Sequence, residues 1–209
     1  MDAQKSGSGP SMRLFRSPFF EACSRTHPAS PALAYGPLSL AFLVWAVHTL
    51  AAWEVAVGFA GGWLLWTVVE YSAHRFVYHF PARSERSRRL LFIVHGVHHA
   101  EPGDPMRCVL PLTLTVPIAA VLWVTLQWPL GTWFPAVGAG LAFGYAAYES
   151  LHYAVHNWPM RHPLVHHLKQ HHMRHHARTD AHVNYGVSAF VWDHVLGTAE
   201  VRRSRRDAA

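Results

Sequence analysis

The sequence predicts an all-α integral membrane protein with four transmembrane helices and a histidine-rich metal site on its cytoplasmic side. Three observations lead to this fold class. Residues 26–53, 55–69 and 108–148 contain no Asp, Glu, Lys or Arg, all 18 Lys and Arg residues fall in three other segments, and 18 His residues gather near those segments. Because a helix needs about 20 apolar residues to cross the hydrocarbon core, the uncharged stretches have membrane length.

The uncharged stretches define the four helices, and the longest stretch holds two of them. We place the spans at residues 33–52, 55–71, 109–127 and 134–151. The second span is short, and it can cross if the helix tilts or if Trp53 and Tyr71 lie at the two interfaces. Residues 1–32, rich in Ser, Gly and Pro, are expected to form a loosely ordered tail, and residues 33–209 a single membrane-embedded domain.

The positions of Lys and Arg test the number of crossings independently. All 18 lie in the N-terminal tail, in the loop 75–107 or in the segment 161–206, and none lies in the turns near residues 53–54 and 128–131. Because positively charged loops stay on the cytoplasmic side, both termini and the metal site are predicted to be cytoplasmic. The net charge of +6 then favours anionic lipid head groups as a partner, and no nucleic acid is expected.

Histidines form two pairs and two triplets along the chain, each pair preceding a triplet. The pairs are His74/His79 and His152/His156, and the triplets are His95/His98/His99 and His172/His175/His176. Since positions i, i+3 and i+4 of a helix share a face, each triplet is predicted to point three imidazoles at one spot. His74 and His79 are five residues apart and need a local unwinding, for which Pro81 offers a cause. Ten imidazoles suit two ions, each with four or five nitrogen ligands and an open position.

Further residues near these motifs are expected to support the ligands from outside the coordination shell. Glu70 and Glu149 each stand one helical turn before a clustered histidine, so we predict that they accept an imidazole N–H, the alternative being an ion pair with Arg. The histidines left over from the second half are expected mostly on a solvated basic face: His162, His166, His167 and His171. His171 and His182 are also candidates for supporting the site. No catalytic residue beyond the ligands is predicted.

These motifs resemble those of the fatty acid hydroxylase/sterol desaturase superfamily, a group of membrane di-iron enzymes. The likeness covers about residues 60–200, and residues 168–176 (LKQHHMRHH) look like the last histidine box of the fatty acid 2-hydroxylases. Residues 185–188 (YGVS) and 192–198 (WDHVLGT) are similar to the closing segment of that family. The resemblance implies a cytosolic helical domain that caps the four membrane helices. It also implies ten metal ligands: His74, His79, His95, His98, His99, His152, His156, His172, His175 and His176.

The function implied by the resemblance is O2-dependent hydroxylation of a lipid acyl chain, of the fatty acid or ceramide 2-hydroxylation type. An alkyl C–H bond is too strong for any amino-acid acid, base or nucleophile, so a redox metal is required. Two iron ions are expected, with O2 as co-substrate, although zinc can replace iron on purification. Nothing in the sequence could be the cytochrome b5 domain often fused to eukaryotic fatty acid 2-hydroxylases. Electrons are therefore expected from a separate cytochrome b5-like or ferredoxin-like protein.

Other functions remain open at this point. A sterol desaturase, a C4-methyl sterol oxidase or a carotenoid hydroxylase would use a similar ligand set, and residues 184–186 (NYG) are reminiscent of the sterol-oxidising relatives. Outside the enzymes, the alternative is a His-rich membrane metal-binding or transport protein. Transport would require ionisable ligands along the membrane path, whereas the predicted spans are almost devoid of polar groups until their cytoplasmic ends.

Overall fold

The computed structural model describes residues 11–178 and 182–200, and within these ranges it contains helices and connecting segments but no strand. The predicted all-α class is therefore confirmed for the described part of the chain. The α-helices are α1 (Pro18–Cys23), α2 (Ser30–Val47), α3 (Ala52–Ser72), α4 (Glu85–Leu91), α5 (Val97–Ala100), α6 (Leu112–Leu130), α7 (Phe134–Asn157), α8 (Pro163–Ala177) and α9 (Val191–Val195). Three short helices of other types are η1 (Ala73–Tyr78) and η2 (Phe92–Gly96), both π-helices, and η3 (Gly131–Trp133), a 3-10 helix.

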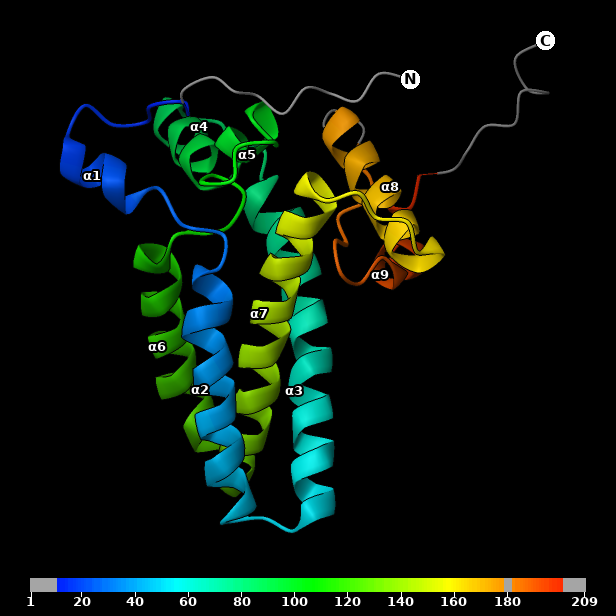
Figure 1. Cartoon of the computed structure of the whole chain (residues 1–209). Helices are drawn as coiled ribbons and strands as arrows, with labels where there is room; N and C mark the ends of the chain where they lie inside the picture. The colour runs from blue at the N-terminus through cyan, green and yellow to red at the C-terminus, as the bar shows by residue number, and fades with distance from the viewer. Residues whose placement is uncertain (1–10, 179–181, 201–209) are drawn as a thin grey trace.

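Four long helices, α2, α3, α6 and α7, form a bundle in which α7 lies between α2 and α3 (Figure 1). Glycines allow α3 and α7 to approach closely. A Cβ added to Gly62 would lie 2.1 Å from the Val137 carbonyl oxygen, and one added to Gly140 would lie 2.1 Å from that of Phe59. Helices in membranes associate through such small residues, because lipid tails leave no hydrophobic drive for association between them.

Three helical stretches are long and apolar enough to cross a membrane: Ser30–Val47, Ala52–Tyr78 and Leu112–Asn157. The third stretch is 46 residues long and includes both α6 and α7. Figure 1 shows these as two separate helices. Large apolar side chains on the bundle are exposed, among them Leu40, Trp63 and Val121, as expected for surfaces that face lipid. The predicted number of four spans counts α6 and α7 separately, and it stays a prediction.

The N-terminal segment differs from the loosely ordered tail that the sequence predicts. Residues 11–29 include α1, and α2 begins within the predicted tail, at Ser30. The reason is Arg107, whose buried guanidinium donates hydrogen bonds to Glu21 Oε1 (2.5 Å) and to the carbonyl oxygens of Ser24 (2.9 Å) and Met12 (2.8 Å). A buried guanidinium must have several acceptors, and this segment supplies them. The rest of the predicted tail, residues 1–10, lies outside the described residues.

The shorter helices α4, α5, α8 and α9 gather around one end of the bundle (Figure 1). Several contacts connect the segment after α8 to the bundle. Val187 packs in a buried cluster with Tyr145 and Tyr148 of α7, and the Trp192 indole N–H donates to the Thr67 hydroxyl of α3 (3.0 Å). All the paired and triplet histidines lie at this end, where α3 and α7 meet the shorter helices. We call α4, α5, α8 and α9 together the cap.

Candidate metal centre

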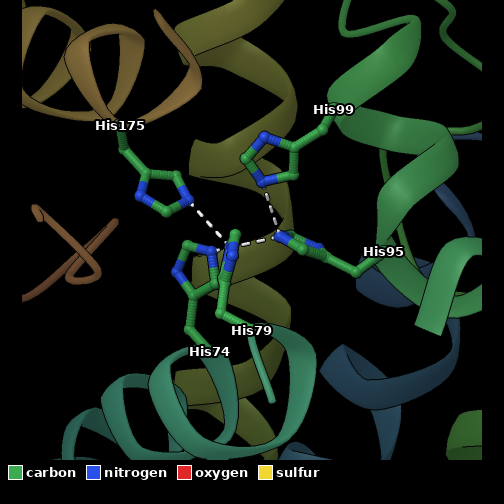
Figure 2. Close-up of side chains that lie close together, drawn as sticks. All are labelled: His74, His79, His95, His99 and His175. Atoms are coloured by element: carbon green, nitrogen blue, oxygen red, sulfur yellow. Dashed lines mark hydrogen bonds between the residues drawn. The ribbon is translucent and has the colours of Figure 1, made fainter. Parts of the chain in front are cut away.

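Five histidines from three segments of the chain come together in a group that we call the His74 cluster. Its members are His74, His79, His95, His99 and His175, and their candidate ligand nitrogen atoms all lie within 4.8 Å of one another. Figure 2 shows the five imidazoles turned toward a common centre. The Nε2 atom of His95 lies 3.1 Å from that of His74 and 2.9 Å from that of His99. This is the arrangement expected of ligands around one ion.

The other five histidines form a second group, the His98 cluster. Its members are His98, His152, His156, His172 and His176, and their candidate ligand atoms also lie within 4.8 Å of one another. The Nε2 atom of His172 lies 3.0 Å from that of His152 and 2.9 Å from that of His156. The two clusters adjoin, since the rings of His99 and His176 stack with centroids 4.2 Å apart.

The prediction that each triplet points its three imidazoles at one spot is wrong. The first and last members of each triplet share a cluster, His95 with His99 and His172 with His176, while the middle members His98 and His175 each enter the opposite cluster. The physical reason is helical geometry: consecutive residues are turned by about 100° around the helix axis, so the i+3 and i+4 members of a triplet face different directions although each lies near residue i. Each half of the chain thus contributes one ligand candidate to the cluster that the other half dominates.

A π-helix brings together the pair His74/His79, which the sequence shows to be too widely spaced for an α-helical face. The backbone N–H of His79 donates to the His74 carbonyl at 3.2 Å, an i to i+5 bond that closes η1. The predicted local unwinding is therefore a wider helical turn, and it begins at Ala73, well before the predicted cause, Pro81. By contrast, His152 and His156 lie on the regular helix α7.

The donor set fits two metal ions. Burial, together with the charge of the neighbouring imidazoles, holds the pKa of His95, His98 and His172 well below the ordinary histidine value. These rings are therefore neutral at pH 7 and offer a lone pair, which is the form that binds metal. Both ring nitrogens of His98 are buried with no hydrogen-bond partner among the described residues, and a bound ion would satisfy one of them. Imidazole nitrogen suits zinc, copper, iron and nickel ions.

Neither predicted supporting carboxylate accepts a hydrogen bond from a clustered imidazole among the described residues. Glu70 instead accepts the backbone N–H groups of Val187 and Ser188, each at 2.8 Å, and also the Ser188 hydroxyl. Glu149 accepts the N–H of Leu110 at 3.3 Å. The alternative of an ion pair with Arg is also not seen for either residue within residues 11–178 and 182–200. Both carboxylates fix the backbone of connecting segments, because a buried acceptor takes whichever donor the tertiary fold brings to it.

Two other predicted residues, His171 and His182, have different surroundings. His171 is buried, so its expected place on a solvated face is wrong, and its Nε2 lies 2.9 Å from Asp193 Oδ2. His162, His166 and His167 are exposed, as that expectation requires. His182 is exposed, and its Nδ1 lies 3.2 Å from the Tyr185 hydroxyl.

Asp193 is a residue that sequence reasoning missed, although it lies in the WDHVLGT segment. It accepts the backbone N–H groups of Tyr185 and Gly186, each at 2.8 Å. Burial acts to raise the pKa of Asp193, but hydrogen bonds from His171, Thr198 and these two amides outweigh it and lower the pKa. A signal for a buried carboxylate was present, since Asp193 stands near the apolar residues Trp192, Val195 and Leu196 in a motif that resembles the family, but its partners could not be read from that.

A small cavity of about 20 Å³ touches both clusters, and this volume holds about one water-sized molecule. It lies where α7, η1, η2 and the segment before α6 meet. Its lining consists of Tyr78, Val94, His95, His98, Arg107, Cys108, Val109, Leu110, Tyr148, Glu149 and His152. His95 belongs to the His74 cluster and the other two histidines to the His98 cluster, so a molecule in this cavity would contact both.

Comparison with known proteins agrees with this geometry. The pattern of the family described as "Fatty acid hydroxylase" matches residues 59–198, which include all ten clustered histidines. The chain belongs to the fatty acid hydroxylase family. It is therefore an oxidoreductase, and the resemblance drawn from the histidine motifs is confirmed.

The relatives within this family include plant, mammalian and yeast enzymes. The chain is 34% identical to the dihydroceramide fatty acyl 2-hydroxylase FAH2 of Arabidopsis thaliana, over 89% of this chain and 79% of that protein. It is 31% identical to the fatty acid 2-hydroxylase of Rattus norvegicus, over 90% of this chain but only 56% of the relative. For the ceramide very long chain fatty acid hydroxylase SCS7 of Saccharomyces cerevisiae the identity is 36%, over 67% of this chain and 37% of that protein. The chain thus spans most of the plant relative and about half of the rat one.

A solved structure shares this fold. It is described as full length scs7p with only the hydroxylase domain visible, and it superposes with a TM-score of 0.83 at 29% identity, covering 89% of this chain and 71% of that one. The helical bundle and its cap are therefore the fold of a hydroxylase domain in this family.

Proposed function

We propose that this chain is a membrane-bound hydroxylase that uses two iron ions and O2 to insert one oxygen atom into a C–H bond of a lipid acyl chain. The observation that carries the proposal is the pair of adjoining five-histidine clusters at one end of an apolar bundle. Such a set of neutral nitrogen donors, without thiolates, suits a pair of redox-active ions. Iron in the two clusters would supply the electrons that activate O2 and the oxidising power that breaks the C–H bond.

The protein itself would position the imidazoles that bind the ions and give the acyl chain of the substrate access to them. The clustered imidazoles are neutral, so no proton has to leave a ligand before an ion binds. The cavity beside them has a volume of about 20 Å³ and so leaves room for about one water-sized molecule next to the clusters. The exposed apolar surface of the bundle supports a substrate that lies in the membrane, from which an acyl chain would reach the cluster end.

The finer features of the proposal follow from the relatives and the charge pattern. The relatives are named as 2-hydroxylases of fatty acids and ceramides, which supports a fatty acyl or ceramide chain as substrate. The positive-inside pattern supports four spans, with the cap and both termini in the cytoplasm. The ten clustered histidines serve as the ligands, residues 33–209 act as one membrane-embedded domain, and electrons come from a separate cytochrome b5-like or ferredoxin-like protein.

The proposal is tested by lipid mass spectrometry of cells that express the chain under heavy-isotope O2. We expect acyl chains that have gained one labelled oxygen atom, and iron in the purified protein. A matched strain expressing His152→Ala should lack the product, because that variant removes a nitrogen of the His98 cluster. Loss of two hydrogen atoms without oxygen gain, or a change confined to sterols or carotenoids, would favour the alternative enzymes. Metal without any lipid oxidation would favour a metal-binding protein.

A further inference from the structure

The two histidine clusters differ in what holds their rings. In the His74 cluster, His74 Nδ1 lies 2.5 Å from the Tyr185 carbonyl oxygen, and His175 Nδ1 lies 2.8 Å from that of Val183. A carbonyl can only accept, so both rings must carry their proton on Nδ1. The tautomer is thereby fixed, and the Nε2 lone pair of each ring points toward the centre of the cluster.

Among the described residues, no ring of the His98 cluster has a comparable hydrogen bond to a backbone carbonyl. Four of its rings have a buried Nδ1 atom that finds no hydrogen-bond partner within residues 11–178 and 182–200: His98, His152, His172 and His176. Packing against neighbouring rings restrains these imidazoles, as in the pair His98 and His152, whose centroids are 4.5 Å apart. Protein hydrogen bonds from the described residues do not select their tautomers.

Two buried carboxylates hold the segment that carries the two carbonyl groups. Asp193 binds the N–H groups of Tyr185 and Gly186, and Glu70 binds those of Val187 and Ser188. Asp193 is itself held by His171 Nε2 at 2.9 Å and by the Thr198 hydroxyl at 2.7 Å.

The fit around Asp193 is close enough to require glycine at position 186. A Cβ there would lie 2.9 Å from Asp193 Oδ2 and 2.6 Å from the Ala189 carbonyl oxygen. The Asp193 carboxylate therefore sets the position of the backbone at Gly186. The Tyr185 carbonyl directly precedes Gly186, so its position is set as well.

We propose that Asp193 is a positioning residue for one metal only: through residues 183–186 it fixes the rings of His74 and His175, so that the His74 cluster binds its ion more tightly than the His98 cluster. The inference rests on the proposed two-metal site. Preorganised ligands lose less freedom on binding, and changing partners outside the coordination shell typically alters metal affinity by about 10–100-fold. Asp193 reaches the metal only through another residue's carbonyl, so its removal should act on affinity rather than on the reaction directly.

The experiment uses two versions of the full chain, each with one cluster disabled. His152→Ala with His172→Ala leaves the His74 cluster, and His79→Ala with His95→Ala leaves the His98 cluster. Each protein, stripped of metal in detergent, is titrated with Co²⁺ against a competing chelator, and the visible spectrum of the bound ion is recorded. Asp193→Asn is then added to both versions.

We expect Asp193→Asn to weaken Co²⁺ binding about 10–100-fold and to change the Co²⁺ spectrum where the His74 cluster remains. Where the His98 cluster remains, we expect less than about a twofold change in affinity, well below the range seen for direct support of a ligand. Glu21→Gln is the matched control, because Glu21 also accepts two backbone N–H groups, from Leu14 and Phe15, and pairs with a cation. It should change neither affinity nor spectrum.

Equal weakening in both versions would overturn the inference, because Asp193 would then support the fold as a whole, and this includes the case in which Asp193→Asn prevents folding. No weakening in either version would overturn it as well. The proposed function fails separately, if the unaltered protein binds no metal at all. Two ions bound by the unaltered protein, with no selective effect of Asp193→Asn, would leave the proposed function standing and remove only this inference.

Discussion

The two halves of the molecule build the same kind of histidine cluster by different backbone routes. In the first half, His74 lies on the π-helix η1 and His79 follows its end, five residues later, whereas in the second half His152 and His156 are four residues apart on the regular helix α7. The first pair belongs to the His74 cluster and the second pair to the His98 cluster. The comparison shows that the ring positions are matched between the halves, while the sequence spacing and the helix type that produce them are not.

The halves also depend on each other. His98 of the first half lies with four histidines of the second, and His175 of the second lies with four of the first. Neither cluster is complete until the two halves dock, and the close approach of α3 and α7 at Gly62 and Gly140 is part of that docking. Metal binding should therefore report on the packing of the bundle as well as on the ligands.

The largest effect should come from replacing His98 or His175, the histidines that join the cluster of the opposite half. These substitutions test directly whether each cluster depends on both halves. His98→Ala removes a nitrogen from the cluster of the second half, and His175→Ala removes one from the cluster of the first. We expect each variant to lose most of one ion per chain and to retain less than about 1% of hydroxylase activity, since ligands act as a unit. Metal analysis with lipid product assays measures both, and His167→Ala, an exposed histidine outside the clusters, is the control. Full metal content in His98→Ala would contradict the assignment.

Acidification should lower the free energy of unfolding, because the clustered histidines are buried in their neutral form. Burial and the charges of nearby imidazoles lower the pKa of His79 to about 3, and burial lowers that of His175 to about 4. In the unfolded chain, histidine takes up its proton near pH 6.5, so the unfolded state binds more protons below that pH and the free energy of unfolding falls as pH falls. Protons also compete with metal for the same nitrogens.

We expect the free energy of unfolding to fall by about 1.4 kcal/mol per pH unit below 6.5 for each of these two histidines, while the folded protein keeps its metal at pH 5, where both rings are still neutral. Dialysis at pH 7 and pH 5, followed by metal analysis and thermal unfolding, measures the effect. Stability that stayed constant down to pH 5 would mean that these rings are not held neutral by burial.

A smaller effect is expected from the contact between the halves within the bundle. Gly140→Ala places a Cβ against the Phe59 carbonyl oxygen and forces α3 and α7 apart, which should cost about 1–3 kcal/mol, as overpacking of a core does. Gly36→Ala is the matched control, because a Cβ there meets nothing within 4 Å. Thermal unfolding in detergent compares the two variants. A Gly140→Ala protein as stable as the Gly36→Ala protein would show that the helices can separate freely.

The smallest effect should follow from making the first half resemble the second. Deleting Val77, an exposed residue of η1, brings His74 and His79 to a spacing of four and lets the π-helix become an α-helix. We expect both ions to be retained and the melting temperature to move by less than about 4 °C, or about 1 kcal/mol for a chain of this size. Loss of one ion, measured by metal analysis, would show instead that the wider turn itself is required.

The sequence by itself determined the features that depend on local pattern and composition. Uncharged stretches of membrane length, the placement of Lys and Arg, and two His-x-x-His-His triplets were enough for the all-α class, the family and the ten histidines that the structure gathers. Such features can be read because they repeat along the chain at the period of a helix or at the thickness of a bilayer. The difficulty of the spacing between His74 and His79 was also visible in the sequence.

Only the tertiary structure decided which histidine joins which cluster, and which groups hold the rings. His98 and His175 each join the cluster that the other half of the chain dominates, and His74 finds the Tyr185 carbonyl 111 residues away along the chain. Glu70 of α3 and Asp193 of α9 bind neighbouring backbone amides of the same segment. Local spacing fixes the face of one helix, but a hydrogen bond between distant segments depends on how whole helices pack, and no local pattern records that.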